Sequence, residues 1–279
     1  MSRLTRAWKT RTISPLDCFQ KNWFPFYAYR EGSSSRYSTS RNYQGVIDRV
    51  APDETNVARV ILNRTELTRN HMTPELQLFL LTPSCELYNA FFQKILEADE
   101  IERKVFSDPF WSIYWPGGQA LTRFILDKGR PLVSGKNVLD LGAGCGATAI
   151  AAKLAGAARV LANDINEVAC TAVSMNALVN RVDVEVSREN LLREPPEVSI
   201  DVVFIGDMLY DEEIAANLIP WIERARRNGT RIYLGDPGRH GLTEDLKKRL
   251  NIQKQYLLPE CVRGENYGYD ECNVWEFRG

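Results

Sequence analysis

The sequence predicts an α/β protein built on a doubly wound, mostly parallel seven-strand sheet. From residue 136 onward, short apolar runs typical of strands alternate with helical patterns, as in sheets whose parallel strands are joined by crossover helices. One run, Val138–Leu141, breaks directly into the turn Gly142-Ala-Gly144-Cys-Gly146. A glycine turn between strand and helix is typical of a nucleotide-like cofactor site at the carboxyl end of such a sheet.

The individual elements follow from these patterns. We expect strands at 137–141, 158–163, 182–186, 201–206, 230–235, 252–258 and 272–278. We expect helices at 146–156, 166–179, 213–227 and 241–250. The last two strands are joined by a polar, glycine-containing loop at 260–270 without a helical pattern, so we expect them to form a C-terminal antiparallel hairpin.

The domain that carries the glycine turn is expected to span 108–279, preceded by a mainly helical N-terminal extension at 42–107. Val57 and Val60 follow a helical spacing in this extension. The run 76–81 fits either a helix or a strand, because its leucines also alternate. The extension is the natural candidate for substrate docking.

Residues 1–41 are rich in arginine and serine, and their only acids are Asp17 and Glu31. This composition is typical of a mitochondrial transit peptide that is removed from the mature protein. A disordered basic tail is the alternative. The segment therefore predicts a mitochondrial protein, with the cytoplasm as a second location.

Composition excludes several classes of function. Residues 1–50 hold nine basic and three acidic residues, which leaves 26 basic and 33 acidic residues, a net charge of −7, in the remainder. An acidic body argues against nucleic acid as a partner. No run approaches the roughly 20 apolar residues of a membrane span. Six cysteines without a C-x-x-C pair, and two histidines, predict no zinc site and no Ser-His-Asp triad.

The glycine turn alone allows two kinds of cofactor. Gly142, Gly144 and Gly146 let a ligand approach the backbone closely, since no Cβ obstructs it. The same letters fit the dinucleotide pattern G-x-G-x-x-G/A, and Asp164 lies where the ribose-binding acid is expected. A dinucleotide and S-adenosylmethionine both remain open on this evidence alone.

Asp140 favours S-adenosylmethionine. It precedes the turn near the carboxyl end of its strand, where we expect it to face the crevice. A carboxylate there repels a pyrophosphate but attracts the ammonium and sulfonium of S-adenosylmethionine. The alternative is that Asp140 caps backbone amides of the turn.

An aromatic segment lies upstream, at 108–121. It holds Phe110, Trp111, Tyr114 and Trp115, followed by a proline and two glycines. Either it is an aromatic plug in the core, or it covers the cofactor, with Gly117 allowing close approach. Indole faces attract cations by roughly 0.5–2 kcal/mol, and a sulfonium is a cation.

Asp207-Met-Leu-Tyr210 follows the strand expected at 201–206, on the same edge of the sheet as Asp140 and Asp164. A carboxylate and a phenol three residues apart can hold an amine beside a cofactor. The alternative is a solvated turn that starts the helix at 213–227.

These motifs resemble those of the seven-strand, class I methyltransferases that use S-adenosylmethionine, which have a Rossmann-like fold. Asp140–Gly146 is similar to the glycine motif of that family, and Asn163-Asp164 to its ribose-binding acid. Asp207–Tyr210 resembles the D-x-x-Y motif of its protein-lysine methyltransferases.

Longer segments resemble, within that family, the lysine methyltransferases that act on the β-subunit of electron transfer flavoprotein. They are Ile113–Leu121, Leu139–Ala152, Gly206–Glu212 and Gly235–Arg239, and the likeness covers roughly residues 70–240. The resemblance implies that lysines of this β-subunit receive up to three methyl groups, in the mitochondrial matrix.

The resemblance also implies roles for residues. The catalytic candidates are Asp207, to orient the incoming amine, and Tyr210, to shape its channel. The cofactor-binding candidates are Trp115, Gly117, Asp140 for the methionine ammonium, Gly142, Gly144, Gly146, Asp164 for the ribose and Asn190 beside the adenine. A small-molecule methyltransferase, a dinucleotide oxidoreductase and a non-catalytic binding module remain alternatives.

Overall fold

The computed structural model describes residues 44–89, 95, 97–265 and 268–279, so the transit peptide predicted at 1–41 lies outside the described residues. Its main feature is a seven-stranded sheet in the order β5-β4-β3-β6-β7-β9-β8. Neighbouring strands from β5 to β7 are parallel, whereas β9 is antiparallel to both β7 and β8. The predicted sheet and its C-terminal hairpin are confirmed.

Most observed elements lie close to those expected, but the helix expected at 241–250 is shorter, at Glu244–Lys247. The strands of the sheet are β3 (Asn137–Leu141), β4 (Arg159–Asn163), β5 (Glu185–Ser187), β6 (Val202–Gly206), β7 (Arg231–Asp236), β8 (Leu250–Leu257) and β9 (Glu271–Phe277). The helices around it are α7 (Pro116–Lys128), α8 (Arg130–Val133), α9 (Ala147–Leu154), α10 (Glu167–Val179), α11 (Glu212–Arg227), α12 (Glu244–Lys247) and α13 (Glu260–Glu265). α13 is a correction, since no helix was expected between the last two strands.

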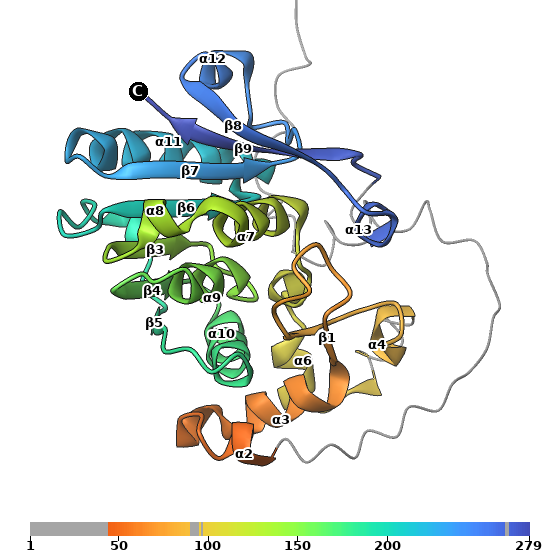
Figure 1. The fold of residues 1–279 in the computed structure, drawn as a ribbon. Helices are drawn as coiled ribbons and strands as arrows, with labels where there is room; N and C mark the ends of the chain where they lie inside the picture. The colour runs from red at the N-terminus through yellow and green to blue at the C-terminus, as the bar shows by residue number, and fades with distance from the viewer. Residues whose placement is uncertain (1–43, 90–94, 96, 266–267) are drawn as a thin grey trace, which may run out of the picture.

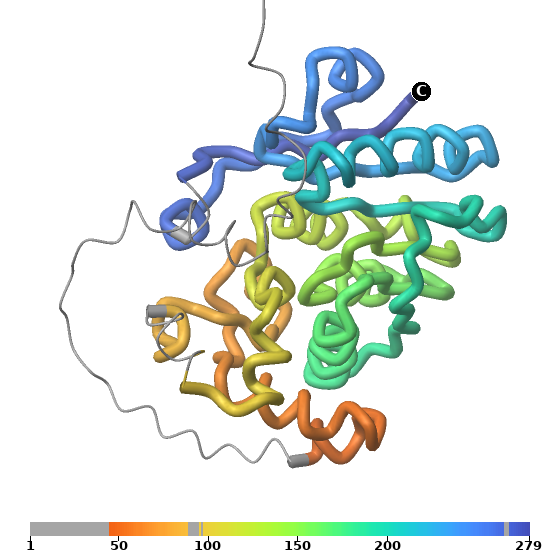
Figure 2. The backbone as a smooth tube through the Cα atoms, turned by 180° about the vertical axis from the view of Figure 1, so that it is seen from behind, coloured from red at the N-terminus to blue at the C-terminus, as the bar shows by residue number. Residues whose placement is uncertain are grey.

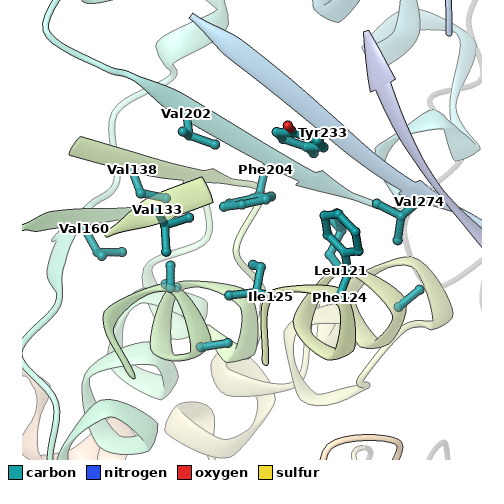
Figure 3. Packing of buried hydrophobic residues seen from close by; sticks show 14 of the residues in the cluster. Leu121, Phe124, Ile125, Val133, Val138, Val160, Val202, Phe204, Tyr233 and Val274 are labelled. Atoms are coloured by element: carbon teal, nitrogen blue, oxygen red, sulfur yellow. The ribbon is translucent and has the colours of Figure 1, made fainter. Parts of the chain in front are cut away.

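Helices cover both faces of the sheet. α7, α8 and α9 lie on the face toward the viewer in Figure 1, whereas α11 lies on the opposite face, seen in Figure 2. Figure 3 shows the hydrophobic core between the sheet and the helices on the α7 side, where Phe124 of α7 meets the rings of Phe204 and Tyr233 from β6 and β7. The Phe124 and Tyr233 ring centroids are 6.0 Å apart. Burial of each such side chain stabilises the fold by about 1.5–3 kcal/mol.

α7 was not expected from the sequence. It begins at Pro116, which suits a first helical position because proline lacks the N–H that would have no partner there. Ala120, Leu121, Phe124 and Ile125 are buried along one side of the helix. Residues 116–128 are therefore a core helix that packs on the sheet, and only 108–115 remain as the segment that leads to it.

The N-terminal extension packs on the domain. Its described elements are α2 (Gln44–Ile47), the 3-10 turn η1 (Pro52–Glu54), α3 (Thr55–Arg64), β1 (Glu66–Thr68), β2 (Leu78–Leu80), α4 (Glu86–Asn89) and α6 (Glu100–Val105). A second 3-10 turn, η2 (Pro109–Ser112), follows the extension. β1 and β2 pair antiparallel, so the run at 76–81 contains a strand, and the extension is not only helical.

The extension shares a core with α10. Phe79, Phe106 and Trp111 are buried in one cluster with Ala172 and Met175 of that helix. The Phe79 N–H also donates to Asn176 Oδ1 at 2.8 Å. The docking role expected for residues 42–107 stays a prediction. Within the described residues, no helix combines the length and apolarity that crossing a bilayer requires.

Candidate active site

Four carboxylates lie along one edge of the sheet, at the carboxyl ends of adjacent strands. Asp164 follows β4, Asp140 is near the end of β3, Asp207 follows β6 and Asp236 ends β7. Ligands of open α/β sheets bind at this edge. We call β3 and β4 with their following turns the cofactor half of the edge, and β6 and β7 with theirs the acceptor half.

The glycine turn leaves an open space at one position. Gly142, Gly144 and Gly146 have φ of +71°, +53° and +78°, which disfavours other residues. A Cβ at Gly142 would collide with Met208, and one at Gly146 would crowd Val173. At Gly144 the nearest atom to such a Cβ, Trp111 Cα, is 4.0 Å away. Gly144 is therefore the turn residue whose missing side chain leaves room for a ligand.

Asp164 is held beside this space by the turn itself. Its Oδ2 accepts from the Gly144 N–H at 2.9 Å, and its Oδ1 accepts from the Asn166 N–H at 3.0 Å. Burial raises the pKa of Asp164, although these two hydrogen bonds oppose the rise. Ile165, the next residue, is 68% exposed. An exposed apolar side chain beside the acid suits the ring system of a nucleoside, and the sequence analysis missed it.

Asp140 is buried, in contrast to the expected exposure to the crevice. Its Oδ2 accepts from the Ala149 N–H, in the first turn of α9, at 2.9 Å. Burial raises the pKa of Asp140 to about 7, and the charge of Asp164 adds to the rise. This hydrogen bond corresponds to the alternative role of Asp140, in which its carboxylate caps a backbone amide. Binding of an ammonium by Asp140 stays a prediction.

Asp207 is fully engaged by other residues. It has a left-handed φ of +54°, which aspartate adopts more readily than most residues, and it is 5% exposed. Its Oδ2 accepts from the Gly117 N–H. Its Oδ1 accepts from Arg239 Nε and Nη2, both at 2.8 Å. Burial raises the pKa of Asp207, and the Arg239 charge opposes this rise. In this conformation Asp207 joins α7 to the turn after β7.

Gly117 serves packing, and the cofactor contact that the sequence analysis expected of it stays a prediction. A Cβ at Gly117 would overlap the carbonyl oxygen of Gly235, and a Cβ at Gly235 would overlap that of Gly117. The start of α7 therefore crosses the end of β7 at a distance that only two glycines permit. This crossing brings the Gly117 N–H to Asp207.

Aromatic rings surround Arg239. Its guanidinium lies 5.3 Å from the ring centroid of Trp115 and 5.4 Å from that of Tyr269. The half-buried Trp115 donates its Nε1–H to Phe110 O at 3.0 Å. Tyr210 is 47% exposed, with its ring centroid 6.4 Å from that of Phe110. Trp115 and Tyr210, both predicted site residues, thus lie in one aromatic group in the acceptor half.

Asn190 lies in the loop after β5, beside the cofactor half. It is exposed and begins the turn η3 (Leu191–Arg193). Asn163, at the end of β4, donates to Glu189 O at 2.9 Å and so ties this loop to the strand that carries Asp164. The place of Asn190 beside the adenine stays a prediction.

Comparison with known proteins identifies the family. The family model described as ribosomal protein L11 methyltransferase (PrmA) matches residues 121–235. The electron transfer flavoprotein beta subunit lysine methyltransferase of Mus musculus is 42% identical over 217 residues, which cover 76% of this chain and 81% of the mouse protein. This chain belongs to the electron transfer flavoprotein beta subunit lysine methyltransferase family.

The likeness extends to distant animals. The homolog of this methyltransferase in Caenorhabditis elegans is 31% identical over 81% of this chain and 98% of its own length. Among solved structures, the magnesium protoporphyrin IX methyltransferase of Synechocystis has a TM-score of 0.45 and 15% identity, and covers 70% of this chain.

The site of this family member includes one residue to which the sequence analysis gave no role. Asp236 was noted only as part of Gly235–Arg239, yet it is 1% exposed and lies beside Asp207. Its Oδ1 accepts from the N–H groups of Gly238 and Arg239, both at 2.7 Å. Burial raises the pKa of Asp236 to about 6, and the Asp207 charge adds to the rise.

The residues of the cofactor half fit S-adenosylmethionine. The open side of Gly144, the adjacent Asp164 and the exposed Ile165 supply room, a hydroxyl acceptor and apolar surface. Within the described part of the chain, no group of three or more histidine, cysteine or acidic side chains is arranged to hold a metal ion.

Proposed function

We propose that this chain transfers methyl groups from S-adenosylmethionine to lysine side chains of the electron transfer flavoprotein β-subunit. The observation that carries the proposal is the 42% identity, over 76% of the chain, to a protein named for this activity. The open glycine turn and the acids at the same sheet edge supply the chemistry that the activity needs.

The cofactor half would hold S-adenosylmethionine. Asp164 would accept hydrogen bonds from the ribose hydroxyls, and the backbone of 142–146 would contact the methionine end. Asp140 contributes negative charge beneath the turn, which favours a cationic ligand. Asn190 and Ile165 would border the adenine. When bound, the cofactor supplies an electrophilic methyl group on a sulfonium.

The acceptor half would prepare the lysine. A free lysine has a pKa of about 10.4 and arrives protonated, so its amine must first lose a proton to become a nucleophile. Passage between Trp115, Phe110 and Tyr210 removes water from the amine and lowers its pKa. Holding the amine in line with the methyl group supplies much of the rate, since a fixed geometry replaces a chance encounter.

Intact-mass analysis of recombinant β-subunit tests this function. The subunit is incubated with the enzyme and S-adenosylmethionine, and peptide mapping then locates any added methyl groups. We expect mass increases of one to three methyl groups on individual lysines, which do not appear without the cofactor. An unchanged β-subunit, with label from the methyl donor recovered only in small molecules of a mitochondrial extract, would contradict the proposal.

We also propose that the enzyme acts in the mitochondrial matrix. The arginine-rich, acid-poor composition of residues 1–41 supports import, and the proposed substrate class agrees with it. A reporter fused to residues 1–41 should enter mitochondria, whereas the same fusion with Arg3, Arg6 and Arg11 changed to glutamate should remain outside. A wild-type fusion that stays in the cytosol would refute this location.

A further inference from the structure

The carboxylate of Asp236 has one oxygen without a partner among the residues that the structure describes. Its Oδ2 is buried, and among the described residues no donor lies within hydrogen-bonding distance of it. Buried polar atoms are nearly always paired, so an unpaired carboxylate oxygen at a ligand-binding edge needs an explanation. The other oxygen, Oδ1, is fully occupied by the backbone turn that leads to Arg239.

A second acceptor that has no partner in the described part of the chain lies on the neighbouring strand. Asn273 of β9 is the direct cross-strand partner of Asp236, so the two side chains lie on the same side of the sheet. Asn273 Oδ1 is also buried without a partner among the described residues. Two adjacent acceptors without donors suit a ligand group that carries several N–H bonds.

Both carboxylate oxygens of Asp207, by contrast, already accept hydrogen bonds. Gly117 and Arg239 occupy both of its carboxylate oxygens. An amine that replaced Arg239 at Oδ1 would break a buried, charge-assisted pair, which is among the stronger contacts in proteins. Asp207 and Asp236 together carry two carboxylates, and the guanidinium of Arg239 can balance the charge of only one of them. The remaining negative charge favours one more cationic or N–H-bearing group.

We propose that Asp236, with Asn273, receives the amine of the target lysine, and that Asp207 is a positioning residue that holds Arg239 and the start of α7. This inference rests on the proposed function. The lysine would arrive past the aromatic group of Trp115, Tyr210 and Tyr269, while Arg239 stays paired with Asp207. Asp236 Oδ2 then accepts an N–H of the neutral amine and leaves the lone pair directed away from the carboxylate.

Substitution of Asp236 by asparagine changes little besides the Oδ2 oxygen. The asparagine side chain can keep the two hydrogen bonds of Oδ1 and replaces only the unpaired oxygen with a donor. We expect Asp236→Asn to have a melting temperature at or above that of the wild type at neutral pH, because burial raises the pKa of Asp236 and asparagine removes its charge. We expect this variant to keep the calorimetric affinity for S-adenosylmethionine and to lower the single-turnover rate of methyl transfer roughly a hundredfold. Asp245→Asn, on the exposed surface of α12, is the matched control and should behave as wild type.

A second readout does not depend on the protein substrate. n-Butylamine reproduces the end of a lysine side chain, and its binding to the complex with S-adenosylhomocysteine can be followed by NMR. We expect Asp236→Asn to weaken this binding roughly tenfold, because one acceptor becomes a donor. If the wild-type enzyme leaves the flavoprotein β-subunit unmethylated, the proposed function fails while this readout still tests Asp236.

Wild-type methyl transfer, or wild-type affinity for n-butylamine, in Asp236→Asn would overturn the inference. A fall in both the cofactor affinity and the melting temperature of Asp236→Asn would also overturn the inference, since the role of Asp236 would then be structural. If Asp236→Asn does not fold, Asn273→Leu decides. It removes the second acceptor, and unchanged binding of n-butylamine in that variant would overturn the inference as well.

Discussion

The cofactor half and the acceptor half of the sheet edge hold their acidic side chains in different ways. In the cofactor half, Asp140 accepts a hydrogen bond from a backbone amide of α9, and Asp164 accepts one from the Gly144 amide in the turn after β3. In the acceptor half, Asp207 is paired with the Arg239 guanidinium, and Asp236 keeps an oxygen without a partner among the described residues. Backbone amides are fixed by the fold, whereas a side-chain cation can move.

This difference suggests that one half binds the cofactor and the other half binds the methyl acceptor. A rigid, amide-lined half suits a cofactor that binds in one pose in every turnover. A half held by a long arginine side chain between two rings suits an acceptor that must enter, react and leave. The predictions below test whether the two halves are energetically distinct.

Arg239→Met has the largest expected effect. It leaves the Asp207 carboxylate buried without its cation, and breaking such a pair costs about 3–5 kcal/mol. Burial already raises the pKa of Asp207, and loss of Arg239 raises it further. A raised carboxyl pKa means that stability falls as pH rises through it, so the loss should be larger at pH 8 than at pH 5. Urea denaturation at both pH values measures this.

Lys248→Met is the control for this loss. Lys248 pairs with Asp245 at 2.7 Å, but both side chains are largely exposed, so its removal should change the free energy of unfolding by less than about 1 kcal/mol. If Arg239→Met and Lys248→Met lowered the free energy of unfolding equally, the buried pair would stabilise the protein no more than a surface pair does, which would contradict the account.

Gly117→Ala should cost about 3 kcal/mol of stability, since its Cβ would overlap the Gly235 carbonyl where helix and strand cross. Gly118→Ala is the matched control. Its Cβ would meet only the Tyr114 ring, at 3.6 Å, and alanine is favoured over glycine in a helix by about 1 kcal/mol. The two adjacent substitutions should therefore shift the denaturation midpoint in opposite directions. A loss of the same size in both would show that the crossing is not as tight as described.

Asp140→Asn should have a smaller effect of the opposite sign. Burial raises the pKa of Asp140 to about 7, so the folded protein binds this proton more tightly than the unfolded chain does. Stability therefore falls between about pH 4 and pH 7 as the carboxyl ionises. Asparagine keeps the hydrogen bond from Ala149 without the charge, and should add on the order of 2 kcal/mol at pH 8 and nothing near pH 3. A gain that does not depend on pH would contradict this origin.

Local signals in the sequence were sufficient for the cofactor half. The run Val138–Leu141 and the glycines after it are contiguous, and Asp164 follows the very next strand, so strand alternation alone brings them together. The strand positions of the sheet follow from the same alternation, which one-dimensional patterns report well.

The acceptor half depends on contacts between distant residues, which no local pattern reports. Asp207 meets Gly117, 90 positions upstream, and Arg239, 32 positions downstream. The crossing of Gly117 and Gly235 became visible only in three dimensions, and it holds the start of α7 against the end of β7. Pro116 and the spacing of the buried residues from Ala120 to Ile125 were the signals that could have predicted it.

One calorimetric comparison tests the division of the edge most directly. S-adenosylmethionine is titrated into Asp164→Ala, which loses the acceptor beside Gly144, and into Asp236→Asn, whose change lies beyond the intervening strands β3 and β6. We predict that cofactor affinity falls roughly tenfold in the first variant and stays at the wild-type value in the second. Equal losses in both, or a loss confined to Asp236→Asn, would contradict the separation of a cofactor half from an acceptor half.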